Sequence, residues 1–277
     1  MQKVFGTHNL VIVCGPTATG KTKFAVELAK QYNGELVSAD SRQVYIGLDV
    51  ISGKDRQDLS GIPIWLYDVV PAEEPFSVSL YRKHAVSAIT DIFSRGKLPI
   101  VVGGTGLYID AIISPPETID IPPDTMLRAR WNTMTVSQLQ QELDPTRLAT
   151  MNQSDKHNPR RLIRALEIFA WRKKHTTMQK KKSPYDPYWI GLTCSLEELE
   201  KRIIERVEKR WGAGALDEAR RYPFANAIGI KSIREFFSGH MLEKEAKEEW
   251  VRQEVAYAKR QITWFKKRKV IHWRDIL

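Results

Sequence analysis

An eight-residue loop at residues 15–22, GPTATGKT, limits more than any other feature what this chain can fold into. It matches the pattern GxxxxGK[ST] and lies between a strand-sized apolar run, Leu10–Cys14, and a segment with helical spacing of apolar residues, Lys21 to Tyr32. In that context the glycines let backbone N–H groups turn toward phosphate oxygens, and the helix N-terminus adds its positive end. The loop therefore predicts a diphosphate or triphosphate ligand, without indicating whether that ligand is ATP.

Every residue of this P-loop is a candidate contact to the phosphates. Lys21 would bring a compact positive charge to the terminal phosphate, and the Thr22 hydroxyl would be a ligand for Mg²⁺, the one cofactor that we expect. The predicted diphosphate-binding residues are Gly15, Pro16, Thr17, Ala18, Thr19, Gly20, Lys21 and Thr22.

Strand-like and helix-like segments alternate along most of the chain, which predicts an α/β fold. The expected strands are apolar throughout, a pattern typical of a parallel sheet that helices cover on both faces. They are Leu10–Cys14, Glu35–Ala39, Ile64–Val70, Leu98–Val102, Tyr188–Cys194 and Val270–Trp273. The expected helices of this P-loop core are residues 21–32, Val78–Arg95, Leu196–Trp211 and Glu243–Lys267.

A basic helical stretch interrupts this core. After Ile113 the proline-rich segment SPPETIDIPPD leads into sequence with helical periodicity and no strand-like run. We therefore expect a smaller all-helical insertion at residues 118–185, within a core made of residues 1–117 and 186–277. The insertion holds 13 Lys and Arg against 6 Asp and Glu, which is +7 of the chain's formal net charge of +10. So local an excess of charge indicates a polyanionic partner.

The composition is that of an ordinary globular protein, with 42% hydrophobic and 27% charged residues. No apolar run reaches the length of about 18 residues that a membrane span needs, and the first apolar stretch continues directly into the P-loop. We expect a cytoplasmic monomer with no membrane association. Cys14 and Cys194 both lie in strand-like runs and are expected to be buried hydrophobic side chains rather than metal ligands.

Three polar segments follow expected strands and should meet at one edge of the sheet. Ligands of open parallel sheets bind outside the carboxyl ends of the strands. The P-loop, the segment Asp40-Ser41-Arg42-Gln43 and the turn Gly103–Gly106 all occupy such positions. Asp40 would then lie near the phosphates, where it could hold Mg²⁺ through water, act as a general base, or only form a turn.

Five motifs in order make the chain resemble the tRNA dimethylallyltransferase (isopentenyltransferase) family. They are GPTATGKT at 15–22, SADSRQVYIGLDV at 38–50, GGTGLYI at 103–109, NPRRLIRALEIF at 158–169 and AYAKRQITWF at 256–265. The resemblance spans nearly the whole chain. It implies transfer of a dimethylallyl group from dimethylallyl diphosphate to the exocyclic N6 of the tRNA adenine on the 3′ side of the anticodon.

The resemblance also implies roles for individual residues. Asp40 would take the proton of the adenine amine, Lys21 and Mg²⁺ would stabilise the departing diphosphate, and Thr105 would contact the substrate. The insertion would grip the anticodon arm, and Arg160 and Arg164 share a helix face suited to phosphates, with Leu162, Leu166 and Phe169 packed inward. The implied tRNA contacts are Asp40, Ser41, Arg42, Gln43, Thr105, Arg128, Arg160, Arg161, Leu162, Ile163 and Arg164.

Several segments depart from the family pattern. Glu254-Val255 stand where the family usually has Thr-Arg, and the connection Glu218 to Asn226 is shorter than usual. The family's GY-K-E segment reads Gly229-Ile230-Lys231-Ser232, and IGTAKP reads Ile51-Ser52-Gly53-Lys54-Asp55. Lys180–Lys182 and Lys266–Lys269 add basic clusters that fit either RNA contacts or solvated surface.

Three other functions remain compatible with these motifs. A small-molecule P-loop kinase would share the strand, the loop and Mg²⁺, and an isopentenyltransferase of free adenine nucleotides would share the donor as well. A catalytically silent tRNA-binding protein would fit the departures near Glu254. The donor that is consumed, and turnover of tRNA, distinguish these alternatives.

Overall fold

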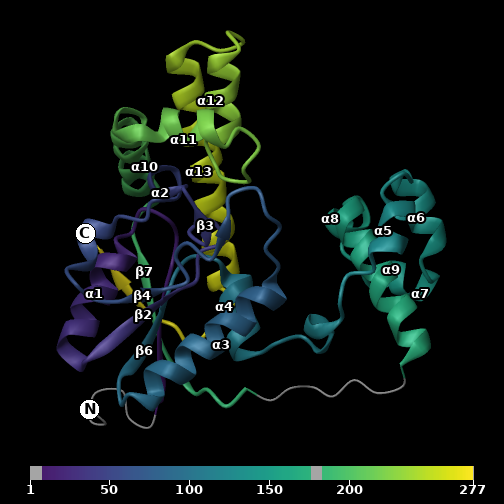
Figure 1. Ribbon diagram of the computed structural model, residues 1–277, viewed down its shortest axis with the longest axis horizontal. Coiled ribbons are helices and arrows are strands. Elements are labelled where there is room, and N and C mark those ends of the chain that lie inside the picture. Colours follow the sequence, from purple (N-terminus) through teal and green to yellow (C-terminus); the bar gives the residue numbers. More distant parts are fainter. Residues whose placement is uncertain (1–7, 176–182, 277) are drawn as a thin grey trace. The chain divides into compact units, whose positions relative to one another are not determined.

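The computed structural model describes residues 8–175 and 183–276, and the chain divides into two compact units (Figure 1). Met1–Ser114 and Ser183–Leu277 form one, the core unit, and Pro115–Lys182 forms the other, the insertion unit. The basic cluster Lys180–Lys182 lies outside the described residues.

The core unit is built on a six-stranded sheet in which every neighbouring pair of strands is parallel. Its order is β4-β2-β6-β1-β7-β8, so β1 lies inside the sheet between β6 and β7. The chain leaves β1 toward β2 on one side and reaches β7 on the other, which makes the end of β1 a topological switch point. The strands are β1 (Leu10–Cys14), β2 (Gly34–Ser38), β4 (Ile64–Trp65), β6 (Leu98–Val102), β7 (Pro187–Thr193) and β8 (His272–Asp275).

Helices cover both faces of this sheet, which confirms the predicted fold class. Successive side chains of a strand point to opposite faces. Leu10 and Ile12 pack with α3 (Val78–Ser94) and α4 (Gly106–Ile113), whereas Val11 and Val13 pack with α1 (Lys21–Tyr32). Figure 1 shows α1 on one side of the sheet and α3 and α4 on the other.

A second core of the same unit lies among its last helices. Trp250 of α13 is fully buried there, together with Ile203 of α10 and Ile233 of α12. The helices are α10 (Leu196–Arg210), α11 (Leu216–Arg221), α12 (Ile230–Phe237) and α13 (Glu243–Phe265), and the kinked turn η3 (Trp211–Ala215) joins the first two.

The predicted strand Ile64–Val70 is wrong, because the chain turns in its middle. Leu66 and Asp68 have φ angles of 70° and 56°, which an extended strand does not allow. The segment is therefore divided between β4 and β5 (Val70–Pro71), and β5 pairs in a separate small sheet with β3 (Tyr45–Ile46). The chain between β3 and β4 forms α2 (Asp49–Ser52) and the 3₁₀ turn η1 (Arg56–Leu59).

The two cysteines differ in burial. Cys14 is buried in β1, and this burial raises the pKa of its thiol to about 12. Cys194 follows the last residue of β7 and is only partly buried, so the expectation of two buried cysteines holds for Cys14 alone.

The described part of the insertion unit is helical and packs around Trp131, Leu139 and Leu162. Phe169, expected to pack inward, is only partly buried. The centroid of its ring lies 4.4 Å from Lys173 Nζ. The helices are η2 (Glu117–Asp120), α5 (Thr125–Trp131), α6 (Val136–Glu142), α7 (Pro145–Thr150), α8 (Gln153–Lys156) and α9 (Pro159–Lys174).

The buried Glu35 carboxylate, on β2, is held by three neighbouring side chains. It accepts hydrogen bonds from Arg95, from Lys97 Nζ at 2.7 Å and from Trp65 Nε1 at 2.9 Å. The bonds from Arg95, and then those from Lys97 and Trp65, lower the pKa of Glu35 from 4.5 to about 2. The ionised form thus stabilises the fold above pH 4.5, and this stabilisation is lost as the pH falls toward 2.

We predict that Glu35→Gln lowers the free energy of unfolding at pH 7 by about 1–2 kcal/mol, a modest value because Arg95 and Lys97 reach solvent. Urea unfolding at pH 7 and at pH 3 measures the difference, which should shrink at the lower pH. Glu27→Gln, at an exposed position of α1, is the control. An equal loss at both pH values would contradict the assignment.

Candidate active site

A pocket with a volume of about 740 Å³ opens in the core unit at the carboxyl ends of the strands. The P-loop, Asp40 and Gly103 line it, so the three polar segments expected at this edge do meet. Further walls come from the loop of residues 49–58 and from helices α10 and α13.

The P-loop adopts a tightly curled backbone. Gly15 and Gly20 have φ angles of 135° and 69°, and a Cβ on Gly15 would lie 2.3 Å from the Leu192 carbonyl oxygen. Lys21 Nζ and Thr19 Oγ1 both donate to the carbonyl of Pro16, at 2.5 and 2.8 Å. The loop is thus held in shape by its own side chains and by close contact with β7.

Lys21 is a partly buried cation that lines this pocket. Burial lowers the pKa of its ammonium group to about 8, against the opposing effect of the nearby Asp40 carboxylate. Because water solvates this ammonium poorly, an anion that enters the pocket would interact with it strongly.

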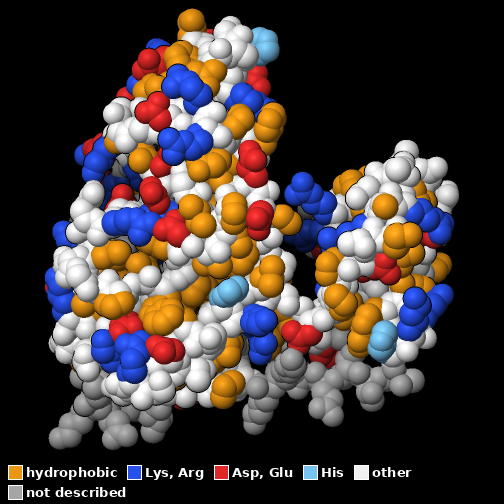
Figure 2. All heavy atoms as spheres, in the orientation of Figure 1, with side chains coloured by type: hydrophobic (Ala, Val, Ile, Leu, Met, Phe, Trp, Pro, Cys, Tyr) orange, Lys and Arg blue, Asp and Glu red, His pale blue; other side chains and the backbone are white. Residues whose placement is uncertain are grey.

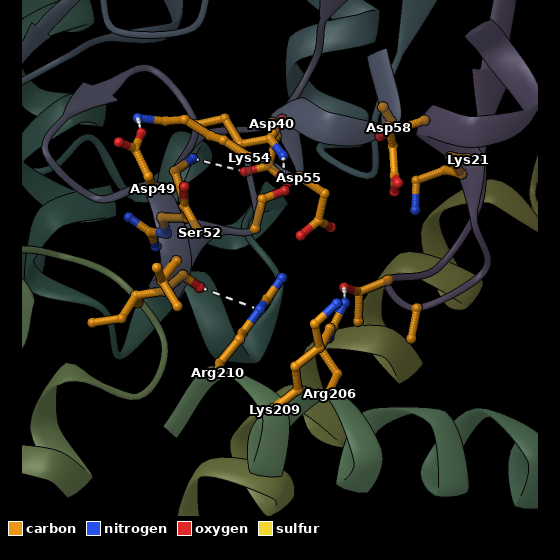
Figure 3. A pocket seen from close by; sticks show the side chains of 18 of the residues that line it. Lys21, Asp40, Asp49, Ser52, Lys54, Asp55, Asp58, Arg206, Lys209 and Arg210 are labelled. Atoms are coloured by element: carbon orange, nitrogen blue, oxygen red, sulfur yellow. Dashed lines mark hydrogen bonds and ion pairs between the residues drawn. The ribbon is translucent and has the colours of Figure 1, made fainter. Parts of the chain in front are cut away.

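Two arginines of α10 join Lys21 at what we call the cationic end of the pocket, defined by Lys21, Arg206 and Arg210 (Figure 3). Arg206 Nη1 donates to Thr17 Oγ1 at 2.7 Å, and Arg210 Nη1 donates to the Ile51 carbonyl at 3.2 Å. Burial lowers the pKa of Arg210 to about 10, so it stays charged at neutral pH. Three cations in one pocket suit a ligand with several negative charges, such as a diphosphate.

Asp40 and Tyr257 line another part of the pocket, which we call the acceptor end and define by these two residues together with Thr105, which contacts Tyr257. Asp40 Oδ1 accepts a hydrogen bond from the Arg42 amide at 2.8 Å, so Asp40 forms a turn as well as lining the pocket. Thr105 Oγ1 accepts from the Ser41 amide at 3.1 Å and lies 3.4 Å from the Tyr257 hydroxyl. Burial raises the pKa of Tyr257 to about 12, which keeps its phenol protonated.

Gln261 of α13 joins the two glycine loops of the site. Its Oε1 accepts from the Thr17 amide at 2.8 Å, and its Nε2 donates to the Gly104 carbonyl at 3.0 Å. A Cβ on Gly104 would lie 2.0 Å from that Nε2, so this contact needs glycine. One P-loop amide is therefore bound to the protein itself and is not free to bind phosphate.

Lys54 fixes the loop that forms the rim of the pocket. Its side chain is fully buried, and its ammonium donates to the Tyr45 carbonyl at 2.6 Å and to the carboxylates of Asp49 and Asp68 at 2.9 and 2.5 Å. Gln43 Nε2 also donates to the Gly53 carbonyl, at 2.9 Å. These bonds hold the segment of residues 45–68 against the turn that carries Asp40.

Known proteins of the same kind share both sequence and structure with this chain. A family model described as IPP transferase matches residues 43–268. The tRNA dimethylallyltransferase of Anoxybacillus flavithermus is 38% identical over 97% of this chain and 91% of its own length. The chain belongs to the IPP transferase family.

Solved structures of the family agree with the fold. The full-length tRNA isopentenylpyrophosphate transferase of Bacillus halodurans superposes with a TM-score of 0.71 at 37% identity, covering 97% of this chain and 90% of its own. A tRNA delta(2)-isopentenylpyrophosphate transferase of Staphylococcus epidermidis gives 0.69 at 31% identity, over 96% and 92% of the two chains.

The basic residues assigned to tRNA in this IPP transferase family member differ in their freedom to bind. Arg164 donates to Glu167 and to the carbonyls of Thr118 and Ile121, and Arg128 forms two bonds to the same buried Glu167. These two arginines hold the insertion unit together. By contrast, Arg160 is exposed.

The remaining insertion residues fall into two groups. Arg161 is exposed and pairs with Asp155. Leu162 and Ile163 are buried in the unit's core, so their side chains pack rather than face a ligand. Figure 2 shows Lys and Arg side chains spread over the visible face of this unit instead of gathered at one point.

The sequence analysis assigned no site role to several residues that line the pocket or bind the P-loop: Arg206, Arg210, Glu254, Tyr257 and Gln261. A signal existed for the first two, because Arg202, Arg206 and Arg210 recur at four-residue spacing on one helix face. The last three recur on α13 at spacings of three and four, which also places them on one face.

None of the helices in residues 8–175 and 183–276 combines the length and the apolar composition that crossing a membrane requires.

The lowered pKa of Lys21 predicts how anion binding depends on pH. Binding of inorganic pyrophosphate should weaken as the pH rises through about 8, since the ammonium loses its proton there. Calorimetric titrations between pH 7 and 9.5 measure this. Lys21→Arg is the matched control, because arginine stays charged over this range and isolates the ligand's own titration. Parallel pH profiles of the two proteins would show that Lys21 does not titrate in the site.

Proposed function

We propose that this protein transfers the dimethylallyl group of dimethylallyl diphosphate to N6 of the tRNA adenine on the 3′ side of the anticodon. The observation that carries the proposal is that one pocket holds both a group of cations suited to a diphosphate and, near Lys21, the Asp40 carboxylate. Membership of the IPP transferase family, and relatives named tRNA dimethylallyltransferase, support it.

The cationic end would serve the leaving group. As the bond between the prenyl carbon and the diphosphate oxygen breaks, negative charge grows on the diphosphate. Lys21, Arg206, Arg210 and the P-loop amides that remain free would stabilise it. These groups are fixed by the fold before the donor arrives, so little reorganisation is needed.

Mg²⁺ fits this end of the pocket. Among the described residues no group of three or more His, Cys, Asp or Glu side chains could enclose a metal ion by itself. Magnesium is usually held by one or two protein oxygens together with phosphate oxygens and water. Thr22, at the start of α1 and on the pocket wall, would supply the protein oxygen, and the ion would neutralise charge on the diphosphate.

The acceptor end would serve the adenine. The lone pair of the N6 amine is delocalised into the ring, so a base must take its proton as the new bond to carbon forms. Asp40 would accept that proton, while Thr105 and the neutral Tyr257 position the turn and the base. In this step the bond between N6 and the prenyl carbon forms, and the bond between that carbon and the diphosphate oxygen breaks. The proton of the amine goes to Asp40.

Access to this buried site requires the adenine to leave its stack in the anticodon loop. We propose that the insertion, residues 118–185, grips the anticodon arm while the core, residues 1–117 and 186–277, carries the chemistry. Its local charge of +7 supports this division, since tRNA binding depends on phosphate contacts.

The function is tested by incubating the protein with dimethylallyl diphosphate, Mg²⁺ and tRNA, and analysing the tRNA nucleosides by mass spectrometry. We expect prenylated adenosine from the wild type. Asp40→Asn should retain binding of donor and tRNA while kcat falls by about a hundredfold to ten-thousandfold, because asparagine keeps the turn but not the base. Asp217→Asn, at an exposed position of α11, controls for the loss of one carboxylate.

Other outcomes of this assay are equally informative. Weaker donor binding by Asp40→Asn, restored at high Mg²⁺, would make Asp40 a metal-site residue. A wild-type kcat would leave it as a turn-former. Consumption of nucleoside triphosphate, or prenylation of free adenine nucleotides in place of tRNA, would replace the proposed function.

Two arginines one turn apart on α9 test the role of the insertion. Arg160→Ala should raise the KM for tRNA and reduce the slope of log affinity against log salt by about 0.7–0.9, the value for one phosphate contact. Arg164→Ala should instead lower the melting temperature, because it breaks the bonds to Glu167 and two carbonyls. Filter binding at several salt concentrations and thermal melting measure these effects. Equal salt slopes for Arg160→Ala and the wild type would assign Arg160 to plain surface.

A further inference from the structure

A buried carboxylate lies inside the cationic end of the pocket. Glu254, on α13, is 5% exposed, and its Oε2 lies 2.9 Å from Arg206 Nη2. Its Oε1 lies 3.7 Å from Arg210 Nη1. The carboxylate thus sits against two of the three cations that would hold the diphosphate.

We infer that Glu254 acts as an internal anion that weakens the binding of diphosphate at this end of the pocket. This inference rests on the proposed function, because it needs a diphosphate ligand there. Glu254 is one of two adjacent residues on α13 that depart from the family pattern, and the mechanism above gives it no other part.

The geometry of Arg206 shows what the carboxylate competes for. One guanidinium nitrogen binds Thr17 Oγ1 at 2.7 Å and another binds Glu254, so Arg206 bridges the P-loop and α13. A diphosphate that enters must share this cation, and Arg210 beside it, with a negative charge that the fold holds in place. Since Glu254 is almost enclosed, solvent and salt screen this repulsion only weakly.

The repulsion acts on the donor and on the released diphosphate alike. Binding that weakens substrate and product equally changes affinity more than the height of the chemical step. The repulsion would speed most the release of the product, because the released diphosphate carries several negative charges. Glu254 therefore sets the residence time of diphosphate in a pocket that three cations would otherwise make very tight.

The test uses inorganic pyrophosphate as the probe, at pH 7 with Mg²⁺ at a fixed concentration, and measures its Kd by calorimetry. Glu254→Gln keeps the size and an acceptor oxygen but removes the charge. We expect its Kd to fall roughly three- to tenfold, because the change removes one negative charge that solvent screens only weakly. Glu208→Gln, which removes an exposed carboxylate of α10 paired with Lys247, should leave the Kd unchanged.

A second pair of variants covers the case in which the single change unfolds the protein by leaving Arg206 unpaired. Arg206→Gln should weaken pyrophosphate binding, and the double variant R206Q/E254Q should bind it more tightly than Arg206→Gln alone, because Arg210 and Lys21 remain. Tighter binding in either pair supports the inference. Unchanged or weaker binding in the folded variants overturns it and makes Glu254 a structural partner of Arg206.

This experiment is independent of the prenyl transfer assay. A protein that binds pyrophosphate as expected but leaves tRNA unmodified would refute the proposed function and preserve the role of Glu254. A protein that modifies tRNA but shows no response to Glu254→Gln would do the reverse.

Discussion

The parallel pairing of β1 with β6 and β7 is the constraint on which the rest of the structure depends. It places the P-loop at the carboxyl end of β1, in the middle of the sheet. From there the chain runs to β2 on one side, and it later reaches β7 on the other. The turn after β2 and the glycines after β6 then reach the same end of the sheet. The site is thus a result of strand order, and the loops only supply its chemistry.

The sequence predicts those elements whose conformation depends on neighbouring residues, and it fails where contacts between distant segments decide. β1, α1 and β6 follow from short apolar runs and a glycine motif, and their bounds agree with the prediction. The break in Ile64–Val70 could not be read in this way, because Leu66 and Asp68 take left-handed backbone angles without glycine. Arg164 looked like a phosphate ligand from its helix face, yet it also donates to the carbonyls of Thr118 and Ile121, which only the packed unit brings to it.

The pocket combines two electrostatic requirements that oppose each other. In the proposed mechanism its cationic end would hold a leaving group with several charges, whereas its acceptor end would supply a carboxylate that takes a proton. Helix α13 contributes to both ends from one face, with Glu254 and Gln261 beside the P-loop and Tyr257 beside Thr105. One helix therefore ties the strength of anion binding to the position of the acceptor.

The bond between Gln261 and the Thr17 amide joins residues that are 244 positions apart. Arg206 reaches the same loop from 189 positions away. On the ribosome, β1 and the P-loop emerge first, but their shape is completed only by helices synthesised much later. A nascent chain therefore carries the P-loop sequence for most of its synthesis without the bonds from Arg206 and Gln261 that complete the site.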